Sequence, residues 1–201
     1  MFINILAAVF WLFNINSTTG ARLQYHIVEP SRLTIAGSSN INNFECTSSS
    51  NFNDGSVTVV THEDGRSLQF SNASINLKIK SFDCKNNLLN RDFYRTLNAD
   101  TNPTIRIELQ QIETSSTAAS GKWNKFKSKV TITLNKVSKD INLDLSGCQY
   151  KTGDYHVCGS TELHMSDFGI KPPTTMLGLI QVENKITIDF DLFLQTSPTI
   201  Q

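Results

Sequence analysis

Four cysteines are the residues whose type and spacing most directly indicate chemistry: Cys46, Cys84, Cys148 and Cys158. An even number of cysteines behind an apolar N-terminal segment is typical of disulfides formed in an oxidising compartment. Cys148 and Cys158 lie symmetrically about Gly153 in an expected hairpin, so we predict that they face each other and form one bridge. The second bridge would join Cys46 to Cys84. Zinc is the alternative, but the chain has no Cys-x-x-Cys pair, and we expect no metal.

No group of residues in the sequence points to catalysis. The sequence has no Gly-x-Ser-x-Gly elbow, no phosphate-binding loop, no His-Glu-x-x-His helix and no glycine-rich dinucleotide turn. The four histidines are scattered, and Asp189 and Asp191 alternate with apolar residues, which directs both carboxylates to solvent. We therefore predict no catalytic residue and no cofactor, and keep an enzyme only as an alternative class.

The β-strands of the chain are recognisable from a strict alternation of apolar and polar residues. It recurs in the five segments 73–80, 104–109, 129–135, 140–145 and 185–192. A period of two indicates extended strands with one wet and one dry face, and therefore an antiparallel wall around an apolar interior. One helix is expected over residues 90–98, with Asn90 as its N-cap and Phe93 and Leu97 on one face.

The number and regularity of these strands define the fold class. We predict an all-β fold, a closed antiparallel β-barrel of about eight strands with one short helix. A sandwich is the alternative. The barrel is favoured because the long middle and terminal strands lack the breaks that protect the edges of a sandwich. The chain shows no repeat and no linker, so its 201 residues indicate a single domain.

The first fourteen residues form an apolar segment that is too short to cross a bilayer. We interpret residues 1–20 as a secretory signal segment and residues 21–201 as the domain, in a secreted or periplasmic protein. An uncleaved anchor and a buried first strand are the alternatives. No later stretch is long and apolar enough to span, so we expect no stable membrane insertion of the mature chain. Basic and acidic residues balance at 18 each, which argues against nucleic acid as a partner.

The inward-facing residues of the alternating segments are almost all aliphatic. An interior without a buried charge suits a hydrocarbon chain. The residues that we expect to line such a lumen are Leu77, Ile79, Ile105, Ile107, Leu109, Val130, Ile132, Leu134, Ile141, Leu143, Ile188 and Phe190. Arg91, Arg95 and Lys171, on the helix and on a later crossover, are candidates to meet a polar headgroup at the mouth. Solvated surface charge is the alternative for these three cations.

Several stretches, taken in order, resemble the YceI-like family. They are 31–39 (SRLTIAGSS), Ser81 followed by 90–92 (NRD) and Leu97, 103–107 (PTIRI), 131–141 (TITLNKVSKDI), and 167–170 (DFGI) leading to 178–188 (GLIQVENKITI). The resemblance extends roughly over residues 25–194. It implies a lipocalin-like barrel that binds polyisoprenoid lipids and has no catalytic activity. The four cysteines and the segment 42–46 depart from the family pattern.

The residues and the resemblance together predict a function. We expect an exported carrier or storage protein that holds a polyisoprenoid or another long apolar lipid in the barrel lumen. The alternative is a fully packed barrel or sandwich that acts as a secreted structural or interaction module.

Overall fold

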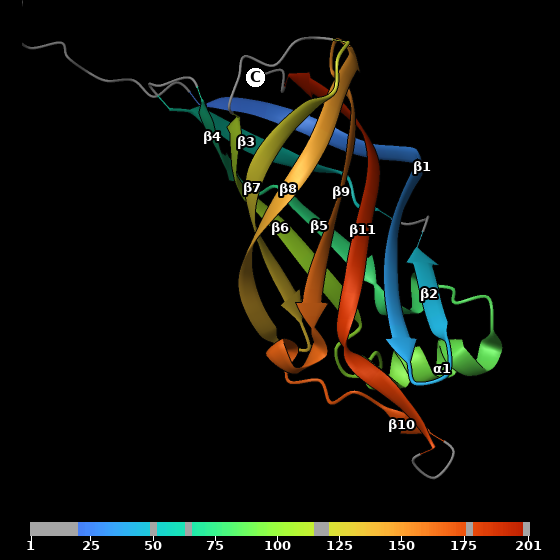
Figure 1. Cartoon of the computed structure of the whole chain (residues 1–201). Helices are drawn as coiled ribbons and strands as arrows, with labels where there is room; N and C mark the ends of the chain where they lie inside the picture. The colour runs from blue at the N-terminus through green and yellow to red at the C-terminus, as the bar shows by residue number, and fades with distance from the viewer. Residues whose placement is uncertain (1–19, 49–51, 63–65, 115–120, 176–178, 199–201) are drawn as a thin grey trace, which may run out of the picture.

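The structure, a computed structural model, describes residues 20–48, 52–62, 66–114, 121–175 and 179–198. Its strands are β1 (Ala21–Ser39), β2 (Asn43–Ser48), β3 (Gly55–Thr61), β4 (Ser67–Ser71), β5 (Ser74–Lys78), β6 (Thr104–Thr114), β7 (Asn124–Leu134), β8 (Val137–Lys151), β9 (Asp154–His164), β10 (Thr174–Thr175) and β11 (Ile180–Pro198) (Figure 1). The helices are α1 (Asn87–Thr96) and the 3₁₀ turns η1 (Ile79–Ser81) and η2 (Met165–Phe168). Within the described ranges, no helix has the length and apolar character needed to cross a membrane.

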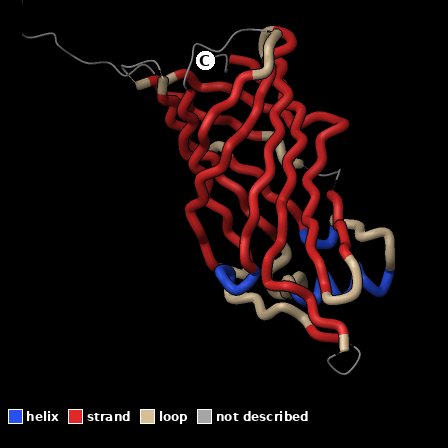
Figure 2. Tube along the Cα trace, in the orientation of Figure 1, coloured by secondary structure: helices blue, strands red, loops and turns tan. Residues whose placement is uncertain are grey.

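Eight of the strands form a closed ring. Antiparallel pairs run through β1, β3, β4, β6, β7, β8, β9 and β11, and β11 returns to β1 (Figure 2). The ring is closed by the long pairing of β1 with β11, which extends from Leu23 opposite Pro198 to Ser39 opposite Val182. The predicted all-β barrel is therefore confirmed, and the sandwich alternative is wrong because the ladder has no free edge between its first and last strands.

The wall is interrupted at one seam. β1 pairs with β3 near its start and with β2 near its end, while β6 pairs first with β5 and then with β4. In the described structure, β2 and the segment after β5 are joined by the bridge between Thr47 and Asp83 and by the Cys46–Cys84 disulfide. This disulfide is the predicted one. It ties the barrel together where no continuous ladder does.

The free edge of β5 is covered by a side chain instead of a strand. The Asn53 amide donates to the carbonyl oxygen of Ser74 at 3.0 Å and accepts from the N–H of Asn76 at 2.6 Å. The Tyr25 hydroxyl donates to the same Ser74 oxygen at 2.6 Å. These bonds satisfy backbone groups of β5 that would otherwise lack a partner.

Helix α1 begins earlier than the sequence predicted. Asn86, not Asn90, is the N-cap, and its side chain accepts from the N–H groups of Leu88 and Leu89. Asn90 lies inside the helix, where its side chain accepts from the N–H of Cys84 at 2.7 Å and donates to Asp83. Neighbouring asparagines all favour the capping position, and the polar partners before the helix decide between them.

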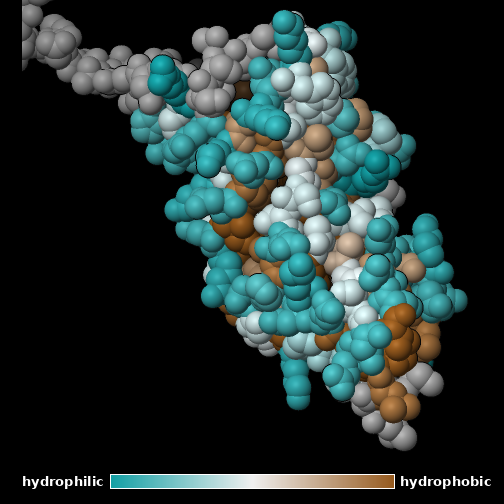
Figure 3. Space-filling view, viewed as in Figure 1, coloured by the Kyte–Doolittle hydropathy of each residue, from teal (hydrophilic) through white to brown (hydrophobic). Residues whose placement is uncertain are grey.

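The two ends of the barrel differ. Helix α1, η2 and β10 lie at the end drawn at the bottom of Figure 1, which we call the helix end. The turn between β8 and β9 and the C-terminal end of β11 lie at the opposite, hairpin end. At the helix end, Asn40 connects two turns, because its side chain bonds to the backbone of both Leu179 and Gln181. Nearby, Ile41 and Leu179 are 63% and 73% exposed, and Figure 3 shows apolar residues gathered at this tip.

Candidate functional site

The structure places the predicted lumen residues on the inner face of the barrel. Cross-strand pairs such as Leu77 opposite Ile105 and Ile107 opposite Ile132 bring them together. All of them are buried except Leu109 and Ile141, which are partly exposed and pack against the same core. The inside–outside assignment derived from the alternation is therefore correct for these strands.

The helix half of the interior is a packed core. Phe82 and Phe168 are 0% and 1% exposed, and the rings of Phe82 and Phe93 lie 5.6 Å apart. Met165 and Ile170, before and after the left-handed Gly169, are also buried in this core. Most of the predicted lumen residues belong to the same hydrophobic cluster as these side chains. In this half the aliphatic side chains pack mainly against one another.

The hairpin half is different, because most of its inward-facing apolar residues remain partly accessible, although Val57 and Leu192 are buried. By strand register the inner face there carries Leu23, Val59, Leu68, Phe70, Ile112, Phe126, Leu145, Val157 and Leu194, all of intermediate exposure. The sequence prediction did not include these residues as ligand contacts. Their signal was weak because they lie near strand ends, where the apolar alternation is shorter. They mark the part of the interior that an incoming molecule reaches first.

No charge is buried inside the described part of the barrel. Its buried polar side chains are three serines: Ser31, Ser48 and Ser128. The Ser128 hydroxyl, which faces the interior, donates to the carbonyl oxygen of Leu143 at 3.0 Å. An interior of this composition offers no counter-ion to a charged group, so it accommodates only apolar ligand surface at low cost.

Residues 28–194 match the family model that is described as "YceI-like domain". The chain belongs to the YceI-like family. A search of curated proteins finds no match.

Solved structures support the YceI-like fold. A polyisoprenoid-binding domain from Saccharophagus degradans, implicated in plant cell wall breakdown, superposes with a TM-score of 0.62 at 11% identity, covering 88% of this chain and 99% of that one. BcnA from Burkholderia cenocepacia superposes with a TM-score of 0.61 at 15% identity, covering 81% and 95%. At these identities the likeness concerns the fold, and it agrees with the lipocalin-like barrel that the sequence resemblance implied.

The three predicted headgroup cations of the YceI-like barrel lie at the helix end. Arg91 and Arg95 are exposed on α1, and Lys171 is exposed in the segment between η2 and β10. Arg95 pairs with Asp92 at 3.0 Å on the helix surface. The structure thus places these cations beside the packed half of the interior and away from the partly accessible half. Their role at a headgroup stays a prediction.

The predicted pairing of Cys148 with Cys158 is wrong in register. Cys148 lies opposite His156, and Cys158 lies opposite Ser146, so the two thiols are diagonal neighbours and both are free. The cause is twofold. The turn consists of Thr152 and Gly153 alone, since Lys151 lies opposite Asp154, and a bulge between Gln149 and Lys151 adds one further residue to β8. In the described structure, no three His, Cys, Asp or Glu side chains form a group that could hold a metal.

Cys158 lies in a polar cluster on the outer wall. His156 Nε2 is 2.7 Å from Asp191 Oδ1, and Arg32 is 2.7 Å from the other oxygen of that carboxylate. The His156 ring stacks on Phe193 with centroids 3.9 Å apart. Burial, and secondly the negative charge of Asp191, raise the pKa of the Cys158 thiol.

The raised pKa of Cys158 predicts slow alkylation of this thiol. The thiolate is the reactive form, and at about pH 8 a higher pKa leaves less of it. Asp191→Asn should therefore shift the pH profile of iodoacetamide modification at Cys158, followed by peptide mass spectrometry, toward lower pH. Asp189→Asn, two residues along the same strand and opposite Ser160, is the control and should leave the profile unchanged. Identical profiles for the two variants would contradict the assigned role of Asp191.

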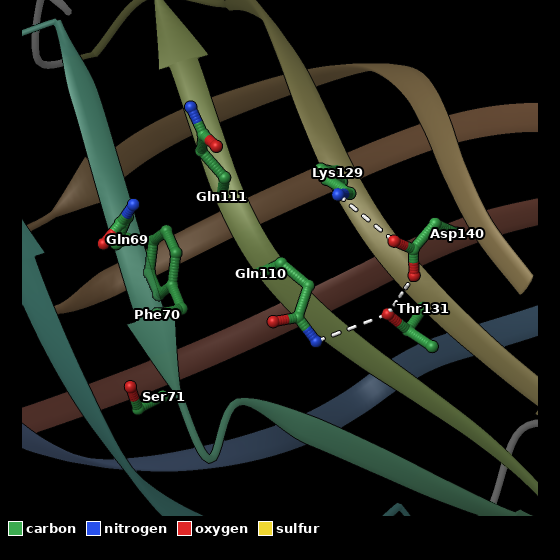
Figure 4. Close-up of a pocket in the computed structure, with 8 residues that line it drawn as sticks. All are labelled: Gln69, Phe70, Ser71, Gln110, Gln111, Lys129, Thr131 and Asp140. Carbon is green, nitrogen blue, oxygen red and sulfur yellow. Dashed lines mark hydrogen bonds and ion pairs between the residues drawn. The ribbon is translucent and has the colours of Figure 1, made fainter. Parts of the chain in front are cut away.

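A recess of about 490 Å³ lies on the outer wall, over the strands β4, β6, β7 and β8 (Figure 4). It is lined by Gln69, Phe70, Ser71, Gln110, Gln111, Lys129, Thr131 and Asp140. Apart from Phe70 these side chains are polar, in contrast to the barrel interior. Sequence reasoning did not find this recess, because its residues come from four strands that only the folded barrel brings together.

Proposed function

We propose that this YceI-like protein binds a polyisoprenoid or another long apolar lipid with its chain in the hairpin half of the barrel. The observation that carries this proposal is the set of partly accessible aliphatic and aromatic side chains on the inner face, in an interior without buried charge. Burial of an apolar chain contributes about 25 cal/mol for each Å² removed from water. A barrel that is already folded keeps the ordering cost of binding low.

The family supports this ligand class. The Saccharophagus degradans domain of similar fold is described as polyisoprenoid-binding. A lining of apolar side chains fits binding and not catalysis, so the role that we propose is that of a carrier or store. We propose no nucleic acid partner, because the formal charge of the chain is balanced.

We propose export for the same protein. The buried Cys46–Cys84 disulfide fits an oxidising compartment such as the periplasm or the extracellular space. The apolar N-terminal residues, which lie outside the described ranges, would act as the signal segment ahead of a domain that starts near residue 21.

Native mass spectrometry of protein purified from its source without detergent tests the function directly. We expect an added mass that corresponds to a long apolar lipid, released on denaturation and identified in the organic extract. The preparation should keep the lipid because a buried chain leaves the interior only by exposing its apolar surface to water. A bare mass under gentle conditions would instead favour a barrel that acts as an interaction module.

Two neighbouring valines offer a matched test of where the chain binds. Val59 faces the interior opposite Phe70, whereas Val60 faces outward opposite Gln69, and both are partly exposed. Val59→Trp fills the hairpin half and should weaken binding of a dansyl-labelled prenol by about ten-fold, as expected when one well-packed segment of chain is excluded. Val60→Trp should bind like the wild type. Equal affinities of two folded variants, checked by circular dichroism, would contradict a lumen site.

A further inference from the structure

The outer recess exists because the barrel wall is interrupted beside it. β4 pairs with β6 as far as Gln69 opposite Gln111, and β5 takes over where Ser74 lies opposite Glu108. Between these pairs β6 carries a bulge at Gln110. Phe70 and Ser71 consequently have no ladder partner on β6. By register Phe70 belongs to the inner face, opposite Val59, and the gap between β4 and β6 allows its ring to line the recess as well (Figure 4).

One wall of the recess is a connected hydrogen-bond network. Gln110 Nε2 lies 3.4 Å from Thr131 Oγ1, which donates to Asp140 Oδ1 at 2.8 Å. Lys129 Nζ lies 3.1 Å from the other oxygen of Asp140. The bonds to Thr131, and then to Lys129, lower the pKa of Asp140, so its carboxylate remains an acceptor at neutral pH. The network holds these groups in one arrangement at the surface.

The opposite wall carries polar side chains that have no hydrogen-bond partner among the described residues. Gln69 and Ser71 make no side-chain hydrogen bond to any residue in the described part of the chain, and Gln69 is exposed. Gln111, between the two walls, donates to Ser67 and to Glu113. A glutamine amide both donates and accepts, and a hydroxyl does the same. The recess therefore presents both hydrogen-bond donors and acceptors, together with the apolar ring of Phe70.

The charge of the recess is balanced, and this selects the class of ligand. Lys129 and Asp140 neutralise each other, so neither a phosphate nor a metal cation finds a net opposite charge. Vicinal hydroxyl groups, which also donate and accept, match amides, hydroxyls and a carboxylate in close array. The carbon-bound hydrogens on the face of a saturated ring suit the negative face of an aromatic ring such as that of Phe70.

We propose that this recess is a binding site for a neutral polyhydroxylated ring of the size of a hexose. Its volume of about 490 Å³ lies in the range of small-molecule sites. The ring could belong to a free sugar or to the headgroup of a glycolipid, whose chain would then pass beside Phe70. The proposal does not depend on lipid binding in the lumen, since all the polar contacts lie on the outer wall.

Side-chain amide NMR spectra of the ¹⁵N-labelled protein provide the readout. Methyl β-D-glucoside is titrated to about 50 mM, which reveals a Kd of up to about 10 mM. Octyl β-D-glucoside, kept below its micellar concentration, and inorganic phosphate are titrated separately. We expect either glucoside to shift the amide signals of Gln69 and Gln110.

Asp140→Asn should weaken this binding about ten-fold, because it replaces a charge-assisted acceptor. Gln69→Ala should also weaken it, whereas Gln195→Ala, at an exposed glutamine of β11, should not.

Each outcome decides the proposal. Similar shifts with both glucosides identify a free sugar site, and shifts with only the octyl compound that depend on Asp140 identify a glycolipid headgroup. Absence of shifts at Gln69 and Gln110 would overturn the proposal, as would octyl glucoside binding that is insensitive to Asp140→Asn. Phosphate that shifts the Gln69 and Gln110 signals of the wild-type protein at lower concentration than either glucoside would also overturn it, because the site would then be one for anions. Val59→Trp is not used here, because Val59 lies opposite Phe70. A protein that binds methyl glucoside but no dansyl-labelled prenol would refute the lumen proposal alone, so failure of the two proposals is recognised separately.

Discussion

Val130→Asp should prevent the barrel from folding or lower its free energy of unfolding by more than about 4 kcal/mol. Val130 is 5% exposed, and its cross-strand neighbours Leu109 and Ile141 are both apolar. A carboxylate at this position would lose its hydration without gaining a partner. Because domains of this size are stable by only about 5–15 kcal/mol, the loss is a large share of the total. Urea unfolding followed by circular dichroism measures the effect.

The matched control is an aspartate on the outer face of the same strand. Thr133 faces outward opposite Arg106, which pairs with Glu108. Thr133→Asp replaces the hydroxyl contact of Thr133 with Ser138 by an exposed carboxylate beside this pair, so it should unfold near the wild-type midpoint. Thr131 is less suitable, because its hydroxyl donates to Asp140 and an aspartate there would face a like charge. If Val130→Asp and Thr133→Asp unfolded at the same urea concentration, the inner and outer faces of β7 would be assigned wrongly.

Loss of the Cys46–Cys84 disulfide should destabilise the protein by about 4 kcal/mol, from the loop-closure entropy of a separation of 38 residues. This disulfide links β2 to the segment after β5, together with the bridge between Thr47 and Asp83 and the hydrogen bond between the hydroxyls of Ser48 and Ser81. The double variant Cys46→Ala, Cys84→Ala removes it without leaving free thiols. We expect a clear fall in the thermal midpoint of this variant, measured by differential scanning calorimetry.

The other two cysteines provide the control for this experiment. Cys148 and Cys158 are free and partly exposed, so Cys148→Ala, Cys158→Ala should change the free energy of unfolding by less than about 1 kcal/mol. A larger loss from this pair than from Cys46 and Cys84 would mean that the outer thiols are bridged in the native protein. Non-reducing mass spectrometry of the same samples identifies the bridge.

The faces of the strands were predictable because each depends on a local pattern. Leu77, Ile105, Ile132 and Ile188 face the interior as the alternation indicated, since a period of two leaves no choice once one face is buried. The single helix was also predicted, although its cap lies at Asn86. The Cys46–Cys84 bridge was predicted as the pair left after Cys148 and Cys158, not from any knowledge of where these two residues meet, and the structure shows this bridge without one between Cys148 and Cys158.

Register and gaps in the wall could not be predicted in this way. The two-residue turn and the bulge near Gln149 together move Cys148 away from the position opposite Cys158, and nothing in the composition of that hairpin marks the extra residue. The bulge at Gln110 and the change of partner from β5 to β4 likewise depend on how the whole wall closes. The recess formed there is consequently a property of four strands together.

The amino-acid sequence alone therefore determined which face of each strand is apolar. Successive side chains of a strand point to opposite faces, so the alternation of apolar and polar residues is sufficient to assign the buried face. Only the tertiary structure shows how far the interior is filled. At the helix end, α1, η2 and the Cys46–Cys84 disulfide surround a packed core that contains Phe82 and Phe168. Packing density is a property of side chains from distant segments in contact, and no local pattern carries that information. For the same physical reason the accessible hairpin half and the polar recess became visible only in the folded barrel.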